Sequence, residues 1–338
     1  MMKTAQIGTG VTQAFKVSFP ELRPRPIRVA EDYDSNADVI LYRGDCAELM
    51  KRIPEESVRL IVTSPPYNIG KAYENRKSLD RYRAEQADII AHYVRLLKDG
   101  GSICWQVGNH VNGGGEIYPL DILLYPIFTT HGLKLRNRII WYFEHGLHCS
   151  HRFSGRYETI LWFTKGNDYV FNLDAVRVPQ KYPGKRYFKG PKAGQYSCNP
   201  LGKNPGDIWA IPNVKHNHPE KTLHPCQFPV ELVQRLVRAL TDKDDWVFDP
   251  FMGVGTAPVA SMLEQRRGMG AEIMDKYADI ARARIAQVTA GTLPIRPMNR
   301  PIYVPPSNSP LTRRSDDSRQ PRLLESVPAY RVRKAKSQ

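Results

Sequence analysis

From residue 38 onward, short runs of apolar residues alternate with longer stretches in which apolar residues recur three and four positions apart. The short runs are rich in Val, Ile and aromatic residues and predict strands, whereas the longer spacing predicts amphipathic helices. Strands are expected at residues 39–42, 58–63, 102–107, 138–143, 158–163, 246–249 and 269–272, and helices at 78–98, 228–240, 256–267 and 275–288. This alternation is typical of an α/β fold built on a mostly parallel sheet.

The end of the first long helix is marked by glycine. Ile90 and Tyr93 fall on one face of this stretch, and Gly100 and Gly101 follow it. Glycine is common just beyond a helix because it adopts a positive φ without strain. The sequence therefore predicts that the helix ends near residue 98 and that a strand starts at residue 102.

Three segments flank or interrupt this pattern. Residues 1–34 contain prolines without clear periodicity and are expected to form an irregular arm, and residues 291–338 are expected to form a basic, Pro-rich flexible tail. Residues 172–222 contain many Gly and Pro residues, five aromatic residues and nine Lys or Arg residues. This insertion is either a long decorated loop or a segment that contacts nucleic acid, since basic and aromatic groups suit phosphate contact and base stacking. The main domain is expected to span residues 35–290.

The chain is strongly basic, with a net charge of +15 and a pI of about 9.6. The tail holds ten Lys or Arg residues and three Asp or Glu residues, so a net charge of +8 remains on the rest of the chain. An excess of this size favours a polyanionic partner, because Lys and Arg release the counterions condensed on phosphates.

The composition disfavours several classes of protein. No apolar run approaches the roughly 20 residues that cross a bilayer, and the polar N-terminus lacks the apolar core of a signal peptide. We therefore expect a cytoplasmic protein without a membrane segment. The five Cys residues, an odd number without a CxxC pair, favour reduced thiols over disulfides. The His and Cys spacings match no common zinc pattern, so no metal is expected.

A glycine-rich turn follows the strand at 246–249. Asp249 ends a hydrophobic run, and the next residues, which include Phe251, Gly253, Gly255 and Thr256, open a helix. Glycine lets the backbone approach a ligand closely, and a helix N-terminus offers free N–H groups. The turn is therefore a candidate cofactor cradle at the carboxyl end of a strand, although an ordinary tight turn has the same pattern.

An acidic residue, Glu272, ends the next strand. A carboxylate at this position can accept hydrogen bonds from two ribose hydroxyls. The glycine turn lacks the third glycine of the dinucleotide fingerprint and the Lys of a P-loop. Together, the turn and Glu272 indicate a cofactor that contains adenosine.

A second motif, Ser64-Pro65-Pro66-Tyr67, follows the strand at 58–63. The two prolines cannot continue the strand, and they stiffen its exit. Such a turn can direct a backbone carbonyl and a side-chain oxygen toward one point, with an aromatic ring beside them. A rigid turn with an exposed Tyr is the alternative interpretation of this motif taken alone.

Taken together, the two motifs resemble those of the DNA amino-methyltransferases, in the permuted class whose catalytic motif precedes the cofactor motif. Three further segments are similar. Residues 43–46 look like the segment that contacts the cofactor's adenine, residues 224–229 like the segment that closes over its methionine end, and residues 156–163 like a late strand near the base pocket. The similarity covers residues 38–290.

The resemblance implies a fold and a site. The fold would be a doubly wound sheet of seven strands, with the strands at 246–249 and 269–272 supplied last. The cofactor would be S-adenosylmethionine, held by Asp45, Asp249, Phe251, Gly253, Gly255, Thr256 and Glu272. The catalytic residues would be Ser64, Pro65, Pro66 and Tyr67. The Ser64 hydroxyl and the Pro65 carbonyl would accept hydrogen bonds from the target amine, and Tyr67 would stack on a base flipped out of the helix.

The substrate implied is double-stranded DNA, and residues 172–222 occupy the position of a target-recognition region. Ser at the first position of the catalytic motif goes in this family with cytosine N4, and Asp with adenine N6. Cytosine N4 is therefore favoured, with adenine N6 as the alternative. A noncatalytic DNA-binding protein and an RNA methyltransferase are more distant alternatives. A restriction endonuclease is a candidate partner, and a monomer and a homodimer both stay open.

Overall fold

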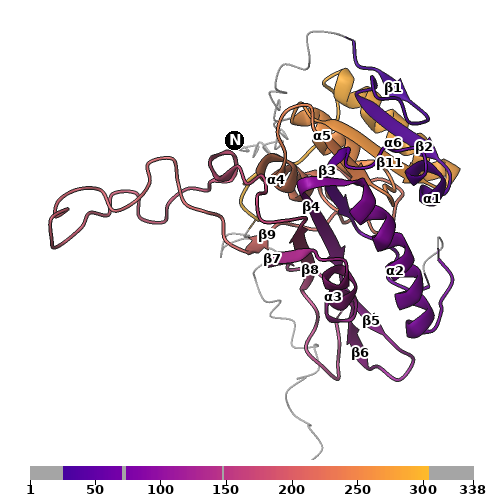
Figure 1. Cartoon of the computed structure of the whole chain (residues 1–338). Coiled ribbons are helices and arrows are strands. Elements are labelled where there is room, and N and C mark those ends of the chain that lie inside the picture. Colours follow the sequence, from indigo (N-terminus) through magenta and orange to yellow (C-terminus); the bar gives the residue numbers. More distant parts are fainter. Residues whose placement is uncertain (1–25, 71–73, 147, 304–338) are drawn as a thin grey trace, which may run out of the picture. The chain divides into compact units, whose positions relative to one another are not determined.

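The computed structural model describes residues 26–70, 74–146 and 148–303 (Figure 1). Most of the expected N-terminal arm and most of the expected tail therefore lie outside the described residues. The chain divides into two units after Arg300, and the first contains all the helices and strands that follow. Within the described residues, no helix combines the length and the apolar character that crossing a membrane requires.

The centre of the fold is a mixed sheet of nine strands among the described residues. Their order across the sheet is β1 (Val29–Ala30), β2 (Val39–Arg43), β11 (Arg267–Glu272), β10 (Trp246–Asp249), β3 (Val58–Thr63), β4 (Leu97–Val107), β8 (Tyr157–Thr164), β7 (Lys134–Tyr142) and β9 (Ile208–Ala210). Neighbours from β1 to β4 are parallel, and β8 runs antiparallel to both β4 and β7. The predicted α/β class with a mostly parallel sheet is confirmed.

All seven predicted strands are present. The last two along the chain, β10 and β11, lie between β2 and β3, so the chain visits the sheet out of order, as the resemblance implied. The sheet contains nine strands among the described residues and not the expected seven, because two short strands, β1 and β9, extend its edges. β1 lies within the expected irregular arm and β9 within the insertion. Each has a neighbour on one side only and spans two or three residues, too few to show an alternating pattern.

The first long helix ends earlier, and β4 starts earlier, than the glycine signal predicted. Helix α2 (Leu79–Leu96) stops where Leu97 turns to an extended backbone and pairs with Val58 of β3. Gly100, with a φ of +69°, lies inside β4 rather than at a helix end. Pairing with β3 therefore decides the local structure of this segment.

Six helices and one 3-10 turn are found in the described residues. Besides α2, the helices are α1 (Cys46–Met50), α3 (Leu120–Thr130), α4 (Val230–Leu240), α5 (Thr256–Leu263) and α6 (Asp275–Thr289), with η1 at Leu173–Val176 and a small hairpin of β5 (Asn109–Val111) and β6 (Ile117–Pro119). Helix α3 was not predicted, because Pro126 inside it normally disfavours a helix and because its residues are apolar on nearly every side.

The helices cover both faces of the sheet, and each face has its own apolar core. Alternate residues of one strand go to opposite sides: Val39 and Leu41 of β2 belong to the core that also contains residues of α4, α5 and α6, whereas Ile40 belongs to the core that contains residues of α1, α2 and α3. This period of two is what a strand buried on both faces requires. The fold is therefore doubly wound.

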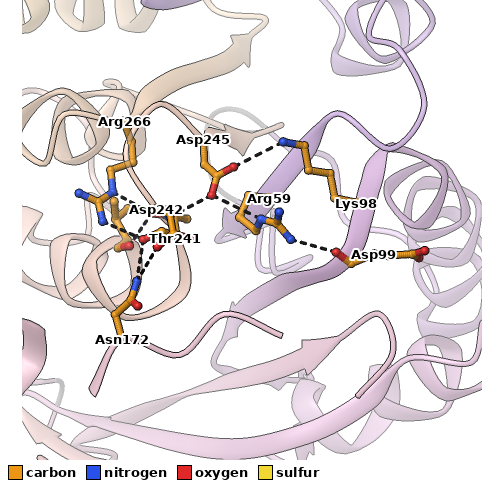
Figure 2. Close-up of polar contacts among 9 residues, drawn as sticks. Arg59, Lys98, Asp99, Asn172, Thr241, Asp242, Asp245 and Arg266 are labelled. Atoms are coloured by element: carbon orange, nitrogen blue, oxygen red, sulfur yellow. Dashed lines mark hydrogen bonds and ion pairs between the residues drawn. The ribbon is translucent and has the colours of Figure 1, made fainter. Parts of the chain in front are cut away.

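A cluster of ion pairs ties β3, β4 and β10 together near their amino ends (Figure 2). The Asp245 carboxylate, on a side chain only 11% exposed, lies 3.4 Å from the Arg59 Nε and 3.4 Å from the Lys98 Nζ. Arg59 also donates to the Asp99 carbonyl at 2.9 Å. These contacts link three neighbouring strands at the edge opposite to their carboxyl ends.

A neighbouring set of hydrogen bonds anchors the start of the insertion (Figure 2). The Asn172 amide donates to the Thr241 carbonyl at 3.0 Å and to the Asp242 carboxylate at 3.1 Å. Arg266 donates to the same carbonyl at 2.7 Å and to the Thr241 hydroxyl at 3.0 Å. The insertion therefore begins at a fixed point next to the turn between α4 and β10.

The insertion contains a long arm of irregular structure, drawn in pink to salmon in Figure 1. Isolated bridges pair Val178 with Lys203 at its base and Arg186 with Tyr196 further out. Its aromatic residues are exposed: Tyr182, Tyr187, Phe188 and Tyr196. No Asp or Glu occurs between residues 175 and 206.

The main domain was expected to end at residue 290, but in the structure its packing continues beyond that residue. Leu293 is buried in the core, and Arg296 is buried with its guanidinium paired to Glu231 of α4. The Glu220 carboxylate accepts from the backbone N–H of Arg296 at 3.0 Å. Packing therefore continues into the segment that was expected to be tail, because it covers the otherwise exposed surface of α4.

Candidate active site

A cavity of about 590 Å³ opens at the carboxyl ends of the central strands. Most of the residues expected from the sequence line it: Asp45, Ser64, Pro65, Pro66, Tyr67, Phe251, Gly253, Thr256 and Glu272. They come from four separate parts of the chain, directly after β2, β3 and β10 and at the end of β11. In a parallel sheet these carboxyl ends meet at one edge, and a volume of this size suits a small organic ligand.

The two sequence motifs are joined directly by one hydrogen bond. Strands β3 and β10 are neighbours, and the Thr63 hydroxyl at the end of one donates to Asp249 Oδ1 at the end of the other, at 2.6 Å. The same oxygen accepts from the backbone N–H of Phe251 at 3.1 Å. Asp249 thus lies beneath the cavity rather than on its wall, and it holds both turns in place.

The Asp249 carboxyl group is fully buried. Burial raises its pKa from 3.8 to about 7, and the negative charge of Glu272 adds to the shift. Its second oxygen, Oδ2, has no hydrogen-bond partner among the described residues. An unpartnered buried acceptor is costly, and functional sites are where such groups are commonly found.

The glycine turn depends on positive φ angles and close packing. Gly253 has a φ of +53° and Gly255 a φ of +74°. A β-carbon on Gly255 would lie 2.9 Å from that of Ala281 in α6, so Gly255 allows the helices to pack and does not itself line the cavity. Beneath the turn, the buried Arg284 donates to the Val254 carbonyl at 2.7 Å.

Two carboxylates stand at the cavity wall. Asp45 accepts from the backbone N–H of Ala47 at 2.8 Å and so caps the first turn of α1. Glu272 accepts from the backbone N–H of Met274 at 2.8 Å. Burial raises the pKa of Glu272, and the nearby N–H groups of Met274, Gly253 and Ile273 oppose that rise. The pair offers acceptors for hydroxyl and amino groups of a ligand.

The proline motif brings together a small hydrogen-bonded group. The Tyr67 hydroxyl lies 3.0 Å from Ser64 Oγ and donates to Glu158 Oε2 at 3.3 Å. The Gln106 side-chain amide donates to the same carboxylate oxygen. Burial raises the pKa of Glu158, and hydrogen bonds from Gln106 and Tyr67 together with the charge of Lys215 oppose that rise.

Three residues outside the predicted site also line the cavity: Glu158, Gln106 and Lys215. Two of them carried a signal. Glu158 and Gln106 are polar residues inside otherwise apolar strand patterns, and such residues usually face a polar partner or a ligand. Lys215 lies in a loop, where no periodicity could mark it.

The segment at 224–229 lies over the glycine turn. The His224 ring packs edge-on against Tyr277 at 4.5 Å, and its Nε2 is 3.3 Å from where a Gly253 β-carbon would stand. Burial and two nearby lysines lower the pKa of His224 to about 4. Throughout residues 26–70, 74–146 and 148–303, no three His, Cys, Asp or Glu side chains gather into a metal-binding group.

The sequence model of the N6/N4 DNA methylase family matches residues 58–283. Over 241 residues the chain is 50% identical to the Type II methyltransferase M.BglII of Bacillus subtilis, covering 71% of this chain and 67% of that protein. It is 31% identical over 263 residues to the DNA adenine methyltransferase YhdJ of Escherichia coli, covering 75% of this chain and 84% of that protein.

Solved structures with the same fold include two methyltransferases. The PvuII DNA methyltransferase, which is cytosine-N4-specific, superposes with a TM-score of 0.58 at 21% identity, covering 75% of this chain and 91% of that chain. A putative DNA modification methylase of Thermus thermophilus, in complex with S-adenosyl-L-methionine, gives a TM-score of 0.54 at 25% identity, covering 78% of this chain and 94% of that chain.

Proposed function

Because this chain belongs to the N6/N4 DNA methylase family, we propose that it transfers a methyl group from S-adenosylmethionine to an exocyclic amine of a base in double-stranded DNA, with cytosine N4 favoured. One observation carries the proposal. The Ser64–Tyr67 motif and the wall formed by Phe251, Gly253 and Glu272 line a single cavity. The group that would activate the amine and the groups that would hold the methyl donor therefore face the same space.

The donors and acceptors of this cavity fit S-adenosylmethionine. The two carboxylates, Asp45 and Glu272, suit the amino and hydroxyl groups of an adenosine. The positive φ of Gly253 keeps the turn before α5 open to a ligand, and Asp249 would hold that turn in place from beneath the cavity through its hydrogen bonds with Thr63 and Phe251. When bound, the cofactor supplies a methyl group that its sulfonium already activates.

The chain's own residues would bind and orient the base. The amine lone pair is conjugated into the ring, so hydrogen bonds from its N–H groups to Ser64 Oγ and the Pro65 carbonyl would draw the nitrogen toward tetrahedral geometry. Tyr67 would stack on the flipped base. Alignment for in-line transfer would account for much of the rate.

The choice of base is the finer part of the proposal. Ser64 favours cytosine N4 through the family tendency described above, and the PvuII enzyme with the same fold has that specificity. The relative YhdJ is an adenine methyltransferase, so adenine N6 is the alternative. Either amine can donate to the same two oxygens, and geometry alone does not separate them.

Double-stranded DNA is the proposed partner. The insertion combines exposed aromatic residues with a stretch from 175 to 206 that carries Lys and Arg but no acidic residue. Such a surface suits phosphates and bases. A restriction endonuclease of the same recognition sequence and a cytoplasmic location are further parts of the proposal, the former because M.BglII is a Type II methyltransferase.

The experiment that tests the proposal identifies the product. The purified protein is incubated with mixed-sequence duplex DNA and methyl-labelled S-adenosylmethionine, and the digested nucleosides are analysed by mass spectrometry. We expect N4-methylcytosine, with N6-methyladenine as the alternative. Ser64→Ala is the matched control and should abolish most labelling. A folded, cofactor-bound protein that labels RNA and not DNA would overturn the proposal.

A further inference from the structure

A chain of hydrogen bonds runs from the cavity to a buried carboxylate. Ser64 Oγ lies 3.0 Å from the Tyr67 hydroxyl oxygen, and that hydroxyl lies 3.3 Å from Glu158 Oε2. The Gln106 backbone carbonyl, 3.4 Å from the Tyr67 hydroxyl, is the competing acceptor. A carbonyl is uncharged, whereas hydrogen bonds to an ionised acceptor are about twice as strong, so Glu158 is the preferred end of the chain.

The carboxylate sets the direction of this chain. An ionised carboxylate can only accept, so the Tyr67 hydroxyl donates to Glu158. The Tyr67 oxygen then accepts the hydrogen of Ser64. This arrangement leaves the lone pairs of Ser64 Oγ directed away from its own hydrogen and available to an amine in the cavity.

Amine methylation releases one proton. The nitrogen forms a bond to the methyl carbon as the carbon–sulfur bond breaks, and the resulting ammonium must lose a hydrogen ion to give the neutral methylated amine. Neither a serine hydroxyl nor a tyrosine hydroxyl retains an added proton near neutral pH. An acceptor is needed within reach of the amine, and Glu158 is the ionisable group at the end of the chain described above.

We propose, resting on the function proposed above, that Glu158 receives this proton through Ser64 and Tyr67. As the nitrogen gives its proton to Ser64 Oγ, Ser64 passes its own hydrogen to the Tyr67 oxygen, and Tyr67 passes its hydrogen to Glu158 Oε2. Both hydroxyls are restored and Glu158 becomes a carboxylic acid. Glu158 does not touch the amine and acts through the two intervening hydroxyls.

Glycine at position 108 leaves room for this arrangement. A β-carbon there would lie 3.2 Å from Glu158 Oε1 and 3.3 Å from Tyr67 Cε2. A side chain would therefore press on both members of the pair. The carboxylate also receives the Gln106 amide, whose hydrogen bond fixes the position of Oε2.

The charged and titratable groups around the pair define the expected pH dependence. Glu158 faces Tyr67 and the positive charge of Lys215, and Tyr67 in turn faces Cys226 and Tyr82. Burial raises the pKa of Glu158 and the Lys215 charge opposes that rise. Since only the ionised form accepts a proton, the rate of methyl transfer should rise with pH as Glu158 ionises.

The test is the single-turnover rate of methyl transfer to duplex DNA, measured with the cofactor-loaded enzyme in excess from about pH 5 to about pH 9. Two variants interrupt the series of hydrogen bonds from Ser64 to Glu158 in different ways. Glu158→Gln still accepts a hydrogen bond from Tyr67 but cannot take a proton, and Tyr67→Phe keeps the ring that would stack on the base. We expect each to slow the wild-type rate by about 10²-fold or more and to remove its rise with pH.

A matched pair outside the cavity supplies the control. The Tyr118 hydroxyl donates to the Glu116 carboxylate at 2.9 Å on the small hairpin. Glu116→Gln and Tyr118→Phe should leave the rate and its pH profile unchanged.

Three results would overturn the inference alone: a wild-type rate that stays flat with pH, a Glu158→Gln rate equal to wild type, or a slow variant that keeps the wild-type pH profile. If Glu158→Gln does not fold, Tyr67→Phe decides by the same criteria. A wild-type protein that methylates no base refutes the proposed function instead, before any variants are compared.

Discussion

The buried Asp249 carboxyl group should leave a measurable mark on how stability varies with pH. Its pKa is raised from 3.8 to about 7, chiefly by burial. A raised pKa means that folding favours the protonated form. The contribution of Asp249 to stability is therefore fully present below about pH 4 and is lost as the pH rises through about 7.

The size of this loss follows from the shift. Each pH unit between the two pKa values corresponds to about 1.4 kcal/mol, so a shift of about three units corresponds to about 4 kcal/mol. Asp249→Asn cannot ionise and should not lose this contribution. Relative to the variant, the wild type should become less stable by up to about 4 kcal/mol between about pH 4 and about pH 8.

The assay is urea denaturation of both proteins across this pH range, without cofactor or DNA. Other buried carboxyl groups with raised pKa that do not act on Asp249 are common to both proteins and cancel in the comparison: Glu158, Glu220 and Glu231. Asp99→Asn, at an exposed carboxylate, controls for the substitution itself. Parallel stability profiles for wild type and Asp249→Asn would refute the reasoning.

Three further outcomes are expected. Gly255→Ala forces a β-carbon onto a backbone with a φ of +74°, 2.9 Å from that of Ala281, and should lower the free energy of unfolding by about 1–3 kcal/mol. Asp245→Asn removes a carboxylate that two cations contact and should cost about 1–3 kcal/mol; unchanged urea midpoints would contradict either expectation. Phe188→Ala, at a side chain 90% exposed on the arm, should weaken DNA binding by about 1–3 kcal/mol in an anisotropy titration while cofactor affinity stays the same.

Much of the fold could be predicted from the sequence because its strands are buried on both faces. Strands β3 and β10 are therefore apolar along most of their length, and both were located to the residue at 58–63 and 246–249. The short strands β1 and β9 could not be found in this way, since two or three residues carry no periodicity. Helix α3 was not predicted, because tertiary packing and not an amphipathic pattern stabilises it around Pro126.

The candidate site was predictable where its residues follow strands in recognisable motifs, and it was not where they depend on tertiary contact. Ser64, Tyr67 and Glu272 stand at or directly after strand ends and could be named from the sequence. Glu158 stands at the start of β8, which enters the sheet antiparallel to β4. Only that antiparallel pairing brings the beginning of a strand to the edge where the other strands end.

The order of the two motifs along the chain has little physical importance once the sheet has formed. Thr63, before the catalytic turn, and Asp249, before the cradle, are 186 residues apart in sequence, yet a hydrogen bond joins them within the sheet. The connections that follow β10 and β3 run toward opposite edges of the sheet, because β10 is followed by its neighbour β11 on one side and β3 by its neighbour β4 on the other. Such a reversal opens a crevice between adjacent carboxyl ends, which is where open α/β sheets bind their ligands. Any connectivity that keeps these two strands adjacent and parallel would therefore build the same cavity, and the permuted order of the motifs is compatible with an unchanged reaction geometry.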